Sequence, residues 1–422
     1  MEILRVEGGK RLEGLVVAKG SKNATLPIIA ASILSSEPVI LHEVPELEDI
    51  SVMTAALRSL GAVVKREDHT LMIDPRPINR VEVDEVITRR MRASNLLMGS
   101  LLGRFGRAQV AYPGGCAIGS RPMDLHIKGF RSLGYEISDL PGYMEGRAKK
   151  TRGKGILLDV PSVGATENIM MAAATVPGLT MLRNAAREPE IVDLQNFLNR
   201  MGANIKGAGL DCIRIEGVDH MQGVEHTVIS DRIEAGTFMI AAAITQGDVW
   251  VENVIIEHVQ PIIAKLTEIG AEVLARPGIV RVIGRKNYIP TDIKTMPYPG
   301  FPTDMQPQMM ALLSKVNGTS VVVETIFENR FMHVQELRRM GIDIKIEGRV
   351  AIINGSGSLQ GATVEASDLR AGAALILAGL GAEGETRISR LDHLDRGYEA
   401  IHERLKSLGA DISREQVGLE QS

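Results

Sequence analysis

The sequence predicts an α/β fold built from six related units, and three observations lead to this prediction. First, two apolar residues three positions apart, followed at once by glycine, occur six times, and the glycines are 73, 68, 68, 71 and 68 residues apart. Second, an apolar residue follows each glycine by three positions. Third, alternating strand patterns joined by glycine turns come next. The six glycines are Gly61, Gly134, Gly202, Gly270, Gly341 and Gly409.

Each copy of this phrase predicts a helix, a stop and a strand. Residues three apart lie on one face of a helix, and glycine just beyond them is the usual left-handed helix stop. The apolar residue after the glycine begins a strand. Such junctions are common in α/β proteins, so a single copy would mean little. Six copies at nearly constant spacing indicate a repeat of about 70 residues.

The residues after each helix stop predict a β-hairpin. In the third unit we expect strands at 204–206 and 212–216, and in the fifth unit at 343–346 and 350–354. Alternation and turn glycines support both hairpins. Cys212 alternates with isoleucines in one of these strands, so we expect it to be inert and buried in the core.

The sixth unit stops early, because the chain ends soon after residues 411–413. Residues 3–8 repeat the pattern of residues 212–217, with a glycine six positions later in both. The N-terminal strand is therefore predicted to complete the sixth unit. One domain would hold repeats one to three, residues 21–229, and the other would hold repeats four to six, residues 1–20 plus 230–422. Two crossings close together predict a hinge and a ligand cleft.

Composition excludes several classes of protein. The chain is 44% hydrophobic and 24% charged, with no apolar run near the roughly 18 residues of a membrane span and no signal-peptide core. We therefore expect a cytoplasmic protein without a membrane partner. A net charge of −4 and 3% aromatic residues argue against nucleic acid. Two cysteines cannot make a disulfide framework, and no spacing indicates a zinc site or another metal site.

Nucleotide-cofactor motifs are also not supported. There is no Walker A loop. The stretch 379–384 has the glycine spacing of a dinucleotide fingerprint, but it follows a helix and precedes a strand, the reverse of the required order. We predict no cofactor.

The most distinctive local signal is the loop at residues 113–122, which reads PGGCAIGSRP. Its glycines and prolines predict a long exposed loop. Cys116 is unusual there, because free cysteine is generally buried. Arg121 would stabilise a thiolate or hold an anion beside the thiol. The alternative is an adventitious surface cysteine.

Basic residues recur near predicted helix starts, where they favour anion binding. Asn23 is expected to be the N-cap of the first helix. A solvated surface residue is the ordinary interpretation of any one basic residue, and their equivalent placement in several units favours a shared role. They are Lys22, Arg92, Arg330, Arg370 and Arg396.

Asp304 precedes a methionine-rich helix and has two interpretations. On spacing alone it is an ordinary N-cap, and the functional alternative is a general base. The methionines Met309, Met310 and Met340 are expected to fill the core.

With these residues assembled, the chain resembles the UDP-N-acetylglucosamine enolpyruvyl transferase (1-carboxyvinyltransferase) family over essentially its whole length. The motifs that carry the resemblance are PGGCAIGSRP at 113–122, SVGAT at 162–166, AREPEIVD ending at Asp193, FPTDMQ at 301–306 and ENRFMH at 328–333. The resemblance implies a two-domain, inside-out α/β barrel with six βαβαββ-type repeats, three in each domain.

The resemblance implies a function for the whole chain. Members transfer the enolpyruvyl group of phosphoenolpyruvate to the 3-hydroxyl of UDP-N-acetylglucosamine by addition and elimination, release phosphate, and so commit the sugar to peptidoglycan synthesis. A monomer without metal or cofactor is expected. A hinge between the domains would let nucleotide-sugar binding bring Cys116 over the pyruvyl carbon.

The resemblance also implies residue roles. Cys116 would protonate the methylene carbon and add covalently to its neighbour, Asp304 would take the sugar hydroxyl proton, and Asp368 would support it. Lys22 and Arg396 would also be catalytic. Phosphoenolpyruvate would be held by Lys22, Asn23, Arg121, Arg330, Arg370 and Arg396. UDP-N-acetylglucosamine would contact Arg92, Arg121, Pro122, Met123, Asp124, Leu125, Ser162, Val163, Gly164, Asp304 and Ile326. Some members carry lysine at the position of Val160, so one diphosphate contact would be missing here.

Charge and thiol chemistry agree with these roles. Phosphoenolpyruvate and the diphosphate are strongly anionic, and arginine forks match phosphate and carboxylate. A free thiol has a pKa of about 8.5 and is mostly protonated near neutrality, although its thiolate is a strong nucleophile. The rivals are transfer to shikimate phosphate, whose family lacks the cysteine loop, a non-catalytic relative, and an RNA 3-terminal phosphate cyclase. The last two lack support in the motifs.

Overall fold

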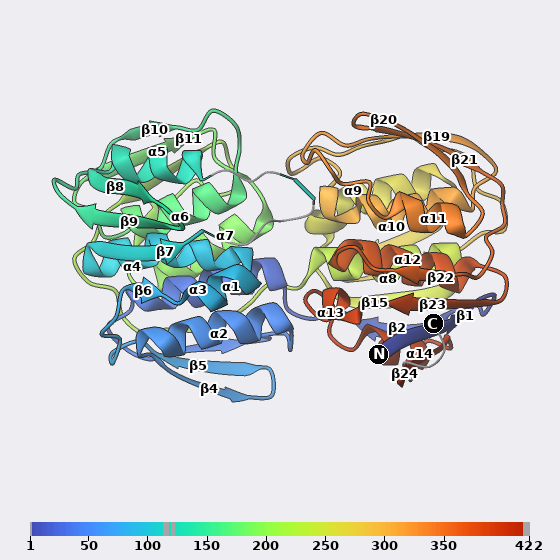
Figure 1. Cartoon of the computed structure of the whole chain (residues 1–422), viewed down its shortest axis with the longest axis horizontal. Helices are drawn as coiled ribbons and strands as arrows, with labels where there is room; N and C mark the ends of the chain where they lie inside the picture. Colours follow the sequence, from blue (N-terminus) through green and yellow to red (C-terminus); the bar gives the residue numbers. More distant parts are fainter. Residues whose placement is uncertain (1, 113–117, 120–122, 417–422) are drawn as a thin grey trace. The chain divides into compact units, whose positions relative to one another are not determined.

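The computed structural model describes residues 2–112, 118–119 and 123–416, and the chain forms two compact units. Unit 1 comprises Met1–Lys19, Ala117–Ser120 and Ser230–Ser422, and unit 2 comprises Gly20–Cys116 and Arg121–Ile229. The first and last strands of the chain both belong to unit 1 (Figure 1).

Unit 2 contains three four-stranded sheets in its described part, with the strand orders β14-β3-β5-β4, β6-β7-β9-β8 and β10-β11-β13-β12. The strands are β3 (Val39–His42), β4 (Val63–Glu67), β5 (Thr70–Asp74), β6 (Glu82–Val83), β7 (Arg107–Ala111), β8 (Tyr135–Leu140), β9 (Tyr143–Ala148), β10 (Gly155–Leu157), β11 (Leu179–Arg183), β12 (Asn204–Lys206), β13 (Cys212–Glu216) and β14 (Glu225–Thr227).

Unit 1 likewise contains three four-stranded sheets among its described residues, ordered β16-β17-β15-β2, β18-β19-β21-β20 and β22-β23-β1-β24. The strands are β1 (Glu2–Glu7), β2 (Glu13–Val17), β15 (Asp248–Val254), β16 (Glu272–Arg276), β17 (Gly278–Ile283), β18 (Ile293–Lys294), β19 (Gly318–Val323), β20 (Asp343–Glu347), β21 (Val350–Gly355), β22 (Thr363–Glu365), β23 (Glu385–Ser389) and β24 (Asp411–Gln416).

All six sheets share one pairing pattern. Each has a parallel pair at one edge and two antiparallel pairings beyond it, so every sheet is mixed. Segments distant in sequence meet in two of the sheets of unit 1. Strand β1 lies between β23 and β24, with Glu2 opposite Gln416, and β2 pairs with β15. The fold is therefore mixed α/β, with sheets that join the N-terminal segment to later parts of the chain.

The helices of unit 2 include three that are largely buried, α1, α4 and α6, because most of their residues are apolar or small. The helices are α1 (Lys22–Ala31), α2 (Glu48–Leu60), α3 (Glu85–Arg90), α4 (Leu97–Phe105), α5 (Asp124–Ser132), α6 (Val163–Ala173) and α7 (Pro189–Arg200), with 3-10 turns η1 (Ser32–Leu34) and η2 (Arg92–Leu96).

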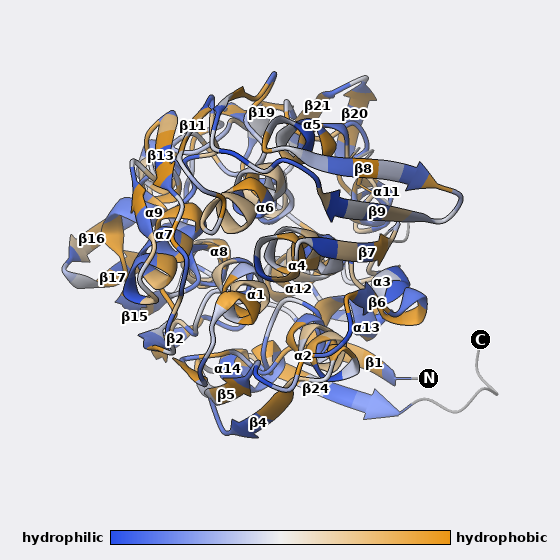
Figure 2. Ribbon diagram, turned by 90° about the vertical axis from the view of Figure 1, so that its left-hand side faces the viewer, coloured by the Kyte–Doolittle hydropathy of each residue, from blue (hydrophilic) through white to orange (hydrophobic). Residues whose placement is uncertain are grey.

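Unit 1 repeats this arrangement with α8, α10 and α12, which pack on one another and are almost wholly buried. Its helices are α8 (Arg232–Ile244), α9 (Ile256–Glu268), α10 (Gln306–Ser314), α11 (Val334–Arg339), α12 (Leu369–Gly381), α13 (Leu391–Leu394) and α14 (Ile401–Ser407), with the 3-10 turn η3 (Thr303–Met305). Each unit has its own hydrophobic core. The polar residues of surface strands such as β8 and β9 stand out in blue in Figure 2.

The structure confirms the local predictions that started from glycine. All six helix-stop glycines have φ between 89° and 108°, in the left-handed region. The two predicted hairpins form as antiparallel pairs, β12 with β13 and β20 with β21. Met309, Met310 and Met340 are fully buried, as expected of core residues.

Two local predictions are wrong. The N-cap of α1 is Ser21, whose Oγ accepts a hydrogen bond from the Ala24 amide at 3.3 Å, and Asn23 is already inside the helix. Cys212 is only half-buried, because the period of two places it with Arg214 on the outer face of β13 while Ile213 points into the core.

None of the helices in the described part combines the length and apolar character that a membrane span requires.

Candidate functional site

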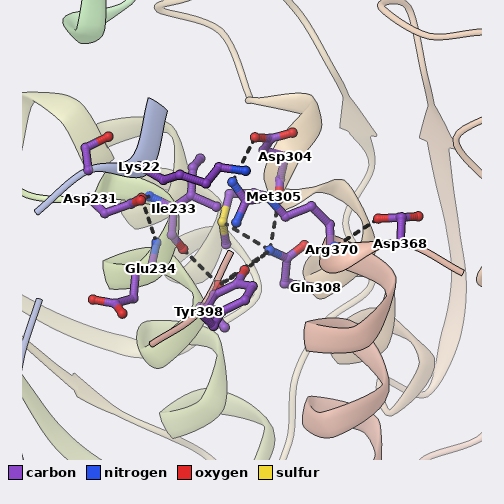
Figure 3. A network of polar contacts seen from close by, with 12 residues as sticks. Lys22, Asp231, Ile233, Glu234, Asp304, Met305, Gln308, Asp368, Arg370 and Tyr398 are labelled. Carbon is purple, nitrogen blue, oxygen red and sulfur yellow. Dashed lines mark hydrogen bonds and ion pairs between the residues drawn. The ribbon is translucent and has the colours of Figure 1, made fainter. Parts of the chain in front are cut away.

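The carboxylate of Asp304 lies between two buried guanidinium groups in unit 1. Figure 3 shows Asp304 together with one of these arginines, Arg370. Its Oδ1 accepts a hydrogen bond from Arg330 Nη2 at 3.1 Å, and its Oδ2 accepts one from Arg370 Nη2 at 3.0 Å. The arginine side chains are only 3% and 2% exposed, whereas that of Asp304 is 27% exposed. The carboxylate therefore pairs with two buried cations at once and still reaches solvent.

The N-cap interpretation of Asp304 is wrong. The residue lies inside the 3-10 turn η3, and the following helix α10 begins at Gln306 with Met305 at its cap position. Both oxygens of the Asp304 carboxylate accept hydrogen bonds from arginine.

Arg370 is positioned by the start of α12. Asp368 is the N-cap of this helix, and its Oδ1 accepts hydrogen bonds from the amides of Arg370 at 2.9 Å and Ala371 at 3.1 Å. Burial lowers the pKa of Arg370, but Asp304, Tyr398 and Asp231 together outweigh burial, so the net pKa shift is upward. The guanidinium group therefore stays charged in the core.

Arg330 lies just before α11, and its guanidinium carbon is 5.6 Å from the ring centroid of Phe327. The backbone just before Arg330 is held by Glu324, a residue directly after β19 that is almost fully buried. Glu324 accepts hydrogen bonds from Thr303 Oγ1 at 3.0 Å and from the Ile326 amide at 2.8 Å. One buried carboxylate thus fixes both the turn that carries Asp304 and the predicted nucleotide-sugar contact Ile326.

Arg396 follows the short helix α13 and is half-buried. Burial lowers the pKa of His393, and the positive charge of Arg396 contributes, whereas Asp368 opposes it. Hydrogen bonds join the predicted residues Asp304, Arg330, Arg370 and Asp368 in unit 1. Unit 1 also carries the predicted residues Ile326 and Arg396.

In unit 2, Lys22 is the first residue of α1 and is 7% exposed. Its Nζ lies 3.3 Å from Oδ2 of the buried Asp49 in α2. The half-buried Asn23 is the next residue of the helix. Lys22 and Asn23 thus place an ammonium group and a side-chain amide at consecutive positions at the amino end of α1.

A buried asparagine joins the other predicted contacts of unit 2. Asn168, in α6, accepts a hydrogen bond at Oδ1 from the Gly99 amide at 2.8 Å, and its Nδ2 lies 3.2 Å from the Asn95 carbonyl and 2.9 Å from His126 Nδ1. These partners lie on α4, η2 and α5. Because η2 begins with Arg92, α5 begins with Asp124 and α6 begins with Val163, one side chain ties together three of the predicted nucleotide-sugar segments.

His126 is held neutral in this cluster. Burial lowers its pKa to about 4, and the positive charge of Arg92 acts in the same direction. The Asn168 amide donates to Nδ1, so the ring proton is on Nε2. A methyl group added at Gly164 would lie 3.3 Å from the His126 ring, so glycine leaves room for the imidazole there.

The remaining contacts of unit 2 surround the start of α6. Ser162 is its N-cap and accepts from the Ala165 amide at 3.4 Å. Val160 and Val163 are exposed, and Asp124 is exposed at the start of α5. Met123 and Leu125 are buried, and Met123 Sδ lies 3.3 Å from Asn95 Nδ2.

Three predicted site residues, Cys116, Arg121 and Pro122, lie outside the described residues. Within the loop 113–122 the structure describes Ile118 and Gly119. The Ile118 carbonyl accepts a hydrogen bond from the Asn329 amide at 3.0 Å, one residue before Arg330.

Sequence reasoning missed Asn168 and Glu324. The partners of Asn168 lie elsewhere in the chain, and Glu324 combines the local amide of Ile326 with the distant Thr303, so no local spacing reveals either role. The one available signal was Glu324 itself, a carboxylate directly after an apolar strand pattern. In the residues that the structure describes, no group of three or more histidine, cysteine, aspartate or glutamate side chains is placed to hold a metal ion.

Comparison with known proteins gives the family. The family model described as EPSP synthase (3-phosphoshikimate 1-carboxyvinyltransferase) matches residues 6–405. A UDP-N-acetylglucosamine 1-carboxyvinyltransferase 1 of Caldanaerobacter subterraneus is 59% identical over 97% of this chain and 98% of its own length. A protein of the same name from Halalkalibacterium halodurans is 56% identical over 98% of this chain and 94% of its own length.

A solved structure supports the same relationship. The enolpyruvyl transferase NikO from Streptomyces tendae is similar with a TM-score of 0.89 and 25% identity, over 99% of both chains. The chain therefore belongs to the EPSP synthase family and, within it, to the UDP-N-acetylglucosamine 1-carboxyvinyltransferases.

Proposed function

We propose that this chain transfers the enolpyruvyl group of phosphoenolpyruvate to the 3-hydroxyl of UDP-N-acetylglucosamine and releases phosphate. In the cytoplasm this would be the first committed step of peptidoglycan synthesis. The observation that carries the proposal is the 59% identity, over nearly the full length, to a protein with that acceptor in its name. The cysteine loop that distinguished this acceptor from shikimate phosphate in the sequence supports the same choice.

Asp304 and its two arginines provide a chemical route for the first proton transfer. While it binds two guanidinium groups, the Asp304 carboxylate is a poor proton acceptor, because the positive charges stabilise its ionised form. The carboxylate of phosphoenolpyruvate matches both guanidinium groups. Once it binds Arg330 and Arg370, the Asp304 carboxylate is released from them and takes the proton of the sugar 3-hydroxyl.

The addition and elimination steps then use the remaining residues. The sugar oxygen forms a bond to the central carbon of phosphoenolpyruvate while the Cys116 thiol gives its proton to the methylene carbon. In the second step a proton leaves the methyl carbon and returns to the Cys116 thiolate, the double bond forms again, and the carbon–oxygen bond to phosphate breaks. Lys22, Asn23, Arg121 and Arg396 would hold the phosphate and stabilise its charge as it leaves.

The segments joined by Asn168 would bind the nucleotide sugar. Arg92 supplies a cation, and the amino end of α6 at Ser162, Val163 and Gly164 supplies backbone amides and the positive end of a helix dipole for the diphosphate. Met123, Asp124 and Leu125, with Arg121 and Pro122, would line the nucleotide, and Ile326 the sugar. Val160 has no charge, so Arg92 and the amino end of α6 would bind the diphosphate here.

We also propose that the two units are the repeat domains expected from the sequence, residues 21–229 and residues 1–20 plus 230–422. Each would close as an inside-out α/β barrel of three βαβαββ repeats. Three sheets of one pairing pattern and three buried helices in each unit support this arrangement.

The test is phosphate release from phosphoenolpyruvate, measured with UDP-N-acetylglucosamine, with shikimate 3-phosphate and with no acceptor. We expect release only with the nucleotide sugar. Asp304→Asn should lower kcat by a factor of about 10² to 10⁴, the usual effect of losing a general base. A rate that is independent of the acceptor, or faster with shikimate 3-phosphate, would overturn the proposal.

A further inference from the structure

Three buried polar side chains meet beneath Asp304 and Arg370 in unit 1. Thr237 is on α8, Gln308 is on α10, and Tyr398 follows α13, and the three are 1%, 0% and 2% exposed. The Tyr398 hydroxyl lies 3.0 Å from Thr237 Oγ1 and 3.1 Å from Gln308 Nε2. We call these three residues the polar triad.

The hydrogen bonds of the polar triad have a fixed direction. Thr237 donates its hydroxyl proton to the Ile233 carbonyl at 2.8 Å, so the Tyr398 hydroxyl donates to Thr237 and accepts from the Gln308 amide. Burial raises the pKa of Tyr398, which keeps the phenol protonated for this role. The two hydroxyl protons therefore have defined acceptors, and the Gln308 amide also lies 3.4 Å from Thr237 Oγ1, which closes the triad.

Members of the polar triad contact both Asp304 and Arg370, which bind each other (Figure 3). Gln308 Nε2 donates to the main-chain carbonyl of Asp304 at 2.9 Å, and since a carbonyl can only accept, the amide nitrogen must face it. The Tyr398 ring lies under Arg370, with 5.4 Å between the guanidinium carbon and the ring centroid. The turn that carries Asp304 and the guanidinium that binds it are thus held by the same three side chains.

The stability of the core does not by itself explain why these three buried residues are polar. Burying hydroxyl and amide groups costs free energy that apolar side chains of the same size avoid. Gln308 even leaves its Oε1 without a hydrogen-bond partner in the described part of the chain. The geometry points to a functional reason for keeping polar groups at this place.

We propose that Thr237, Gln308 and Tyr398 are positioning residues that set the orientation of Asp304 and Arg370 for the reaction. This inference rests on the proposed function. By fixing the η3 turn through its carbonyl and Arg370 through its ring contact, the triad keeps the carboxylate in reach of the sugar hydroxyl when the arginines turn to the substrate. A shift of about 1 Å at such a site can cost a factor of about 10² in rate.

The test compares matched variants in the phosphate-release assay and in thermal unfolding. Tyr398→Phe keeps the ring under Arg370 and removes the hydroxyl, and we expect kcat to fall at least about tenfold, with a much smaller change in KM for UDP-N-acetylglucosamine. Thr237→Val should show a similar loss, and Thr237→Ser, which keeps the hydroxyl, should restore most of the rate.

The control lies on the same helix. Gln306 is fully buried at the start of α10, and its side-chain amide has no hydrogen-bond partner among the described residues. Gln308→Leu should lower kcat, whereas Gln306→Leu should leave kcat unchanged. Turnover by the unmodified protein tests the proposed function separately from these ratios.

A purely structural triad would give a different result. Tyr398→Phe and Gln308→Leu would then lower the unfolding temperature while kcat stayed within about twofold of the unmodified protein, or Thr237→Val and Thr237→Ser would have the same rate. Either outcome would overturn the inference. If Tyr398→Phe does not fold, the comparison of Thr237→Val with Thr237→Ser still decides it.

Discussion

Replacing Asn168 by alanine should loosen the nucleotide-sugar segments of unit 2 and destabilise the protein. The variant leaves the Gly99 amide, the Asn95 carbonyl and His126 Nδ1 without their present partner in a buried place. Each such group costs about 1–3 kcal/mol. Because partial repacking reduces the sum, we expect a loss of about 3–5 kcal/mol and a fall in unfolding temperature of about 10 °C for a unit of this size.

The matched control is Asn199→Ala. Asn199 also makes two partly buried hydrogen bonds, both to the backbone of Ile205 at 2.8 Å. It lies on α7, which is not one of the segments that Asn168 joins. We expect it to lose about 1–2 kcal/mol, since it breaks two neutral hydrogen bonds at a half-buried place. The two variants therefore separate general destabilisation from loss of positioning.

The assay is isothermal titration of UDP-N-acetylglucosamine, run well below the lower unfolding temperature, together with calorimetric unfolding. Asn168→Ala should weaken nucleotide-sugar binding by about tenfold or more, because α5, α6 and η2 lose their common anchor. Asn199→Ala should bind within about twofold of the unmodified protein. Unchanged binding by Asn168→Ala, despite the expected loss of stability, would refute the reasoning.

Three further predictions concern acidity, thiol chemistry and the helix stops. Burial lowers the pKa of His126 to about 4, so as the pH falls the unfolded state binds the proton before the folded state does, and about 2 kcal/mol of stability should be lost between about pH 6.5 and about pH 5. Denaturant titrations of His126→Gln should show a shallower pH dependence of stability than the unmodified protein. The same pH dependence in both proteins would contradict this. A thiol-reactive epoxide analogue of phosphoenolpyruvate should modify Cys116, and peptide mapping that finds the label on Cys212 would reverse that expectation. Gly202→Ala should cost about 1–2 kcal/mol at a φ of 106°, whereas Gly155→Ala, with an ordinary φ and open space, should stay within about 0.5 kcal/mol by the same calorimetry.

The parts of the fold that sequence predicted well are those fixed by local chemistry. A left-handed residue after a helix nearly demands glycine, so Gly61 and Gly341 could be identified from the chain alone. The alternation of the strands at Asn204–Lys206 and Cys212–Glu216 is equally local. The resemblance extended these predictions to the family, which the comparisons confirm.

The wrong predictions share a cause. Ser21 and Asn23 are both good N-caps, and only the backbone of the following turn decides between them. Asp304 also has the sequence context of a cap, but two arginines that are 26 and 66 positions away in the sequence take its carboxylate. The period of two places Cys212 with Arg214 and opposite Ile213, so the sequence pattern already contained this answer and its interpretation as a core position was wrong.

The missed residues are those whose partners are remote. Asn168 meets Asn95 across 73 positions of sequence, and Tyr398 meets Gln308 across 90 and Thr237 across 161. No periodicity relates such positions, so a network of this kind becomes visible only when the helices are packed. The roles assigned to the individual site residues stay predictions.

The most direct test of the central claim is the identity of the product formed from phosphoenolpyruvate and UDP-N-acetylglucosamine. Proton and phosphorus magnetic resonance on the reaction mixture would follow both substrates at once. We expect one nucleotide sugar with a carboxyvinyl group on its 3-oxygen for every phosphate released. Phosphate release with the nucleotide sugar unchanged, or a carboxyvinyl product on shikimate 3-phosphate instead, would contradict it.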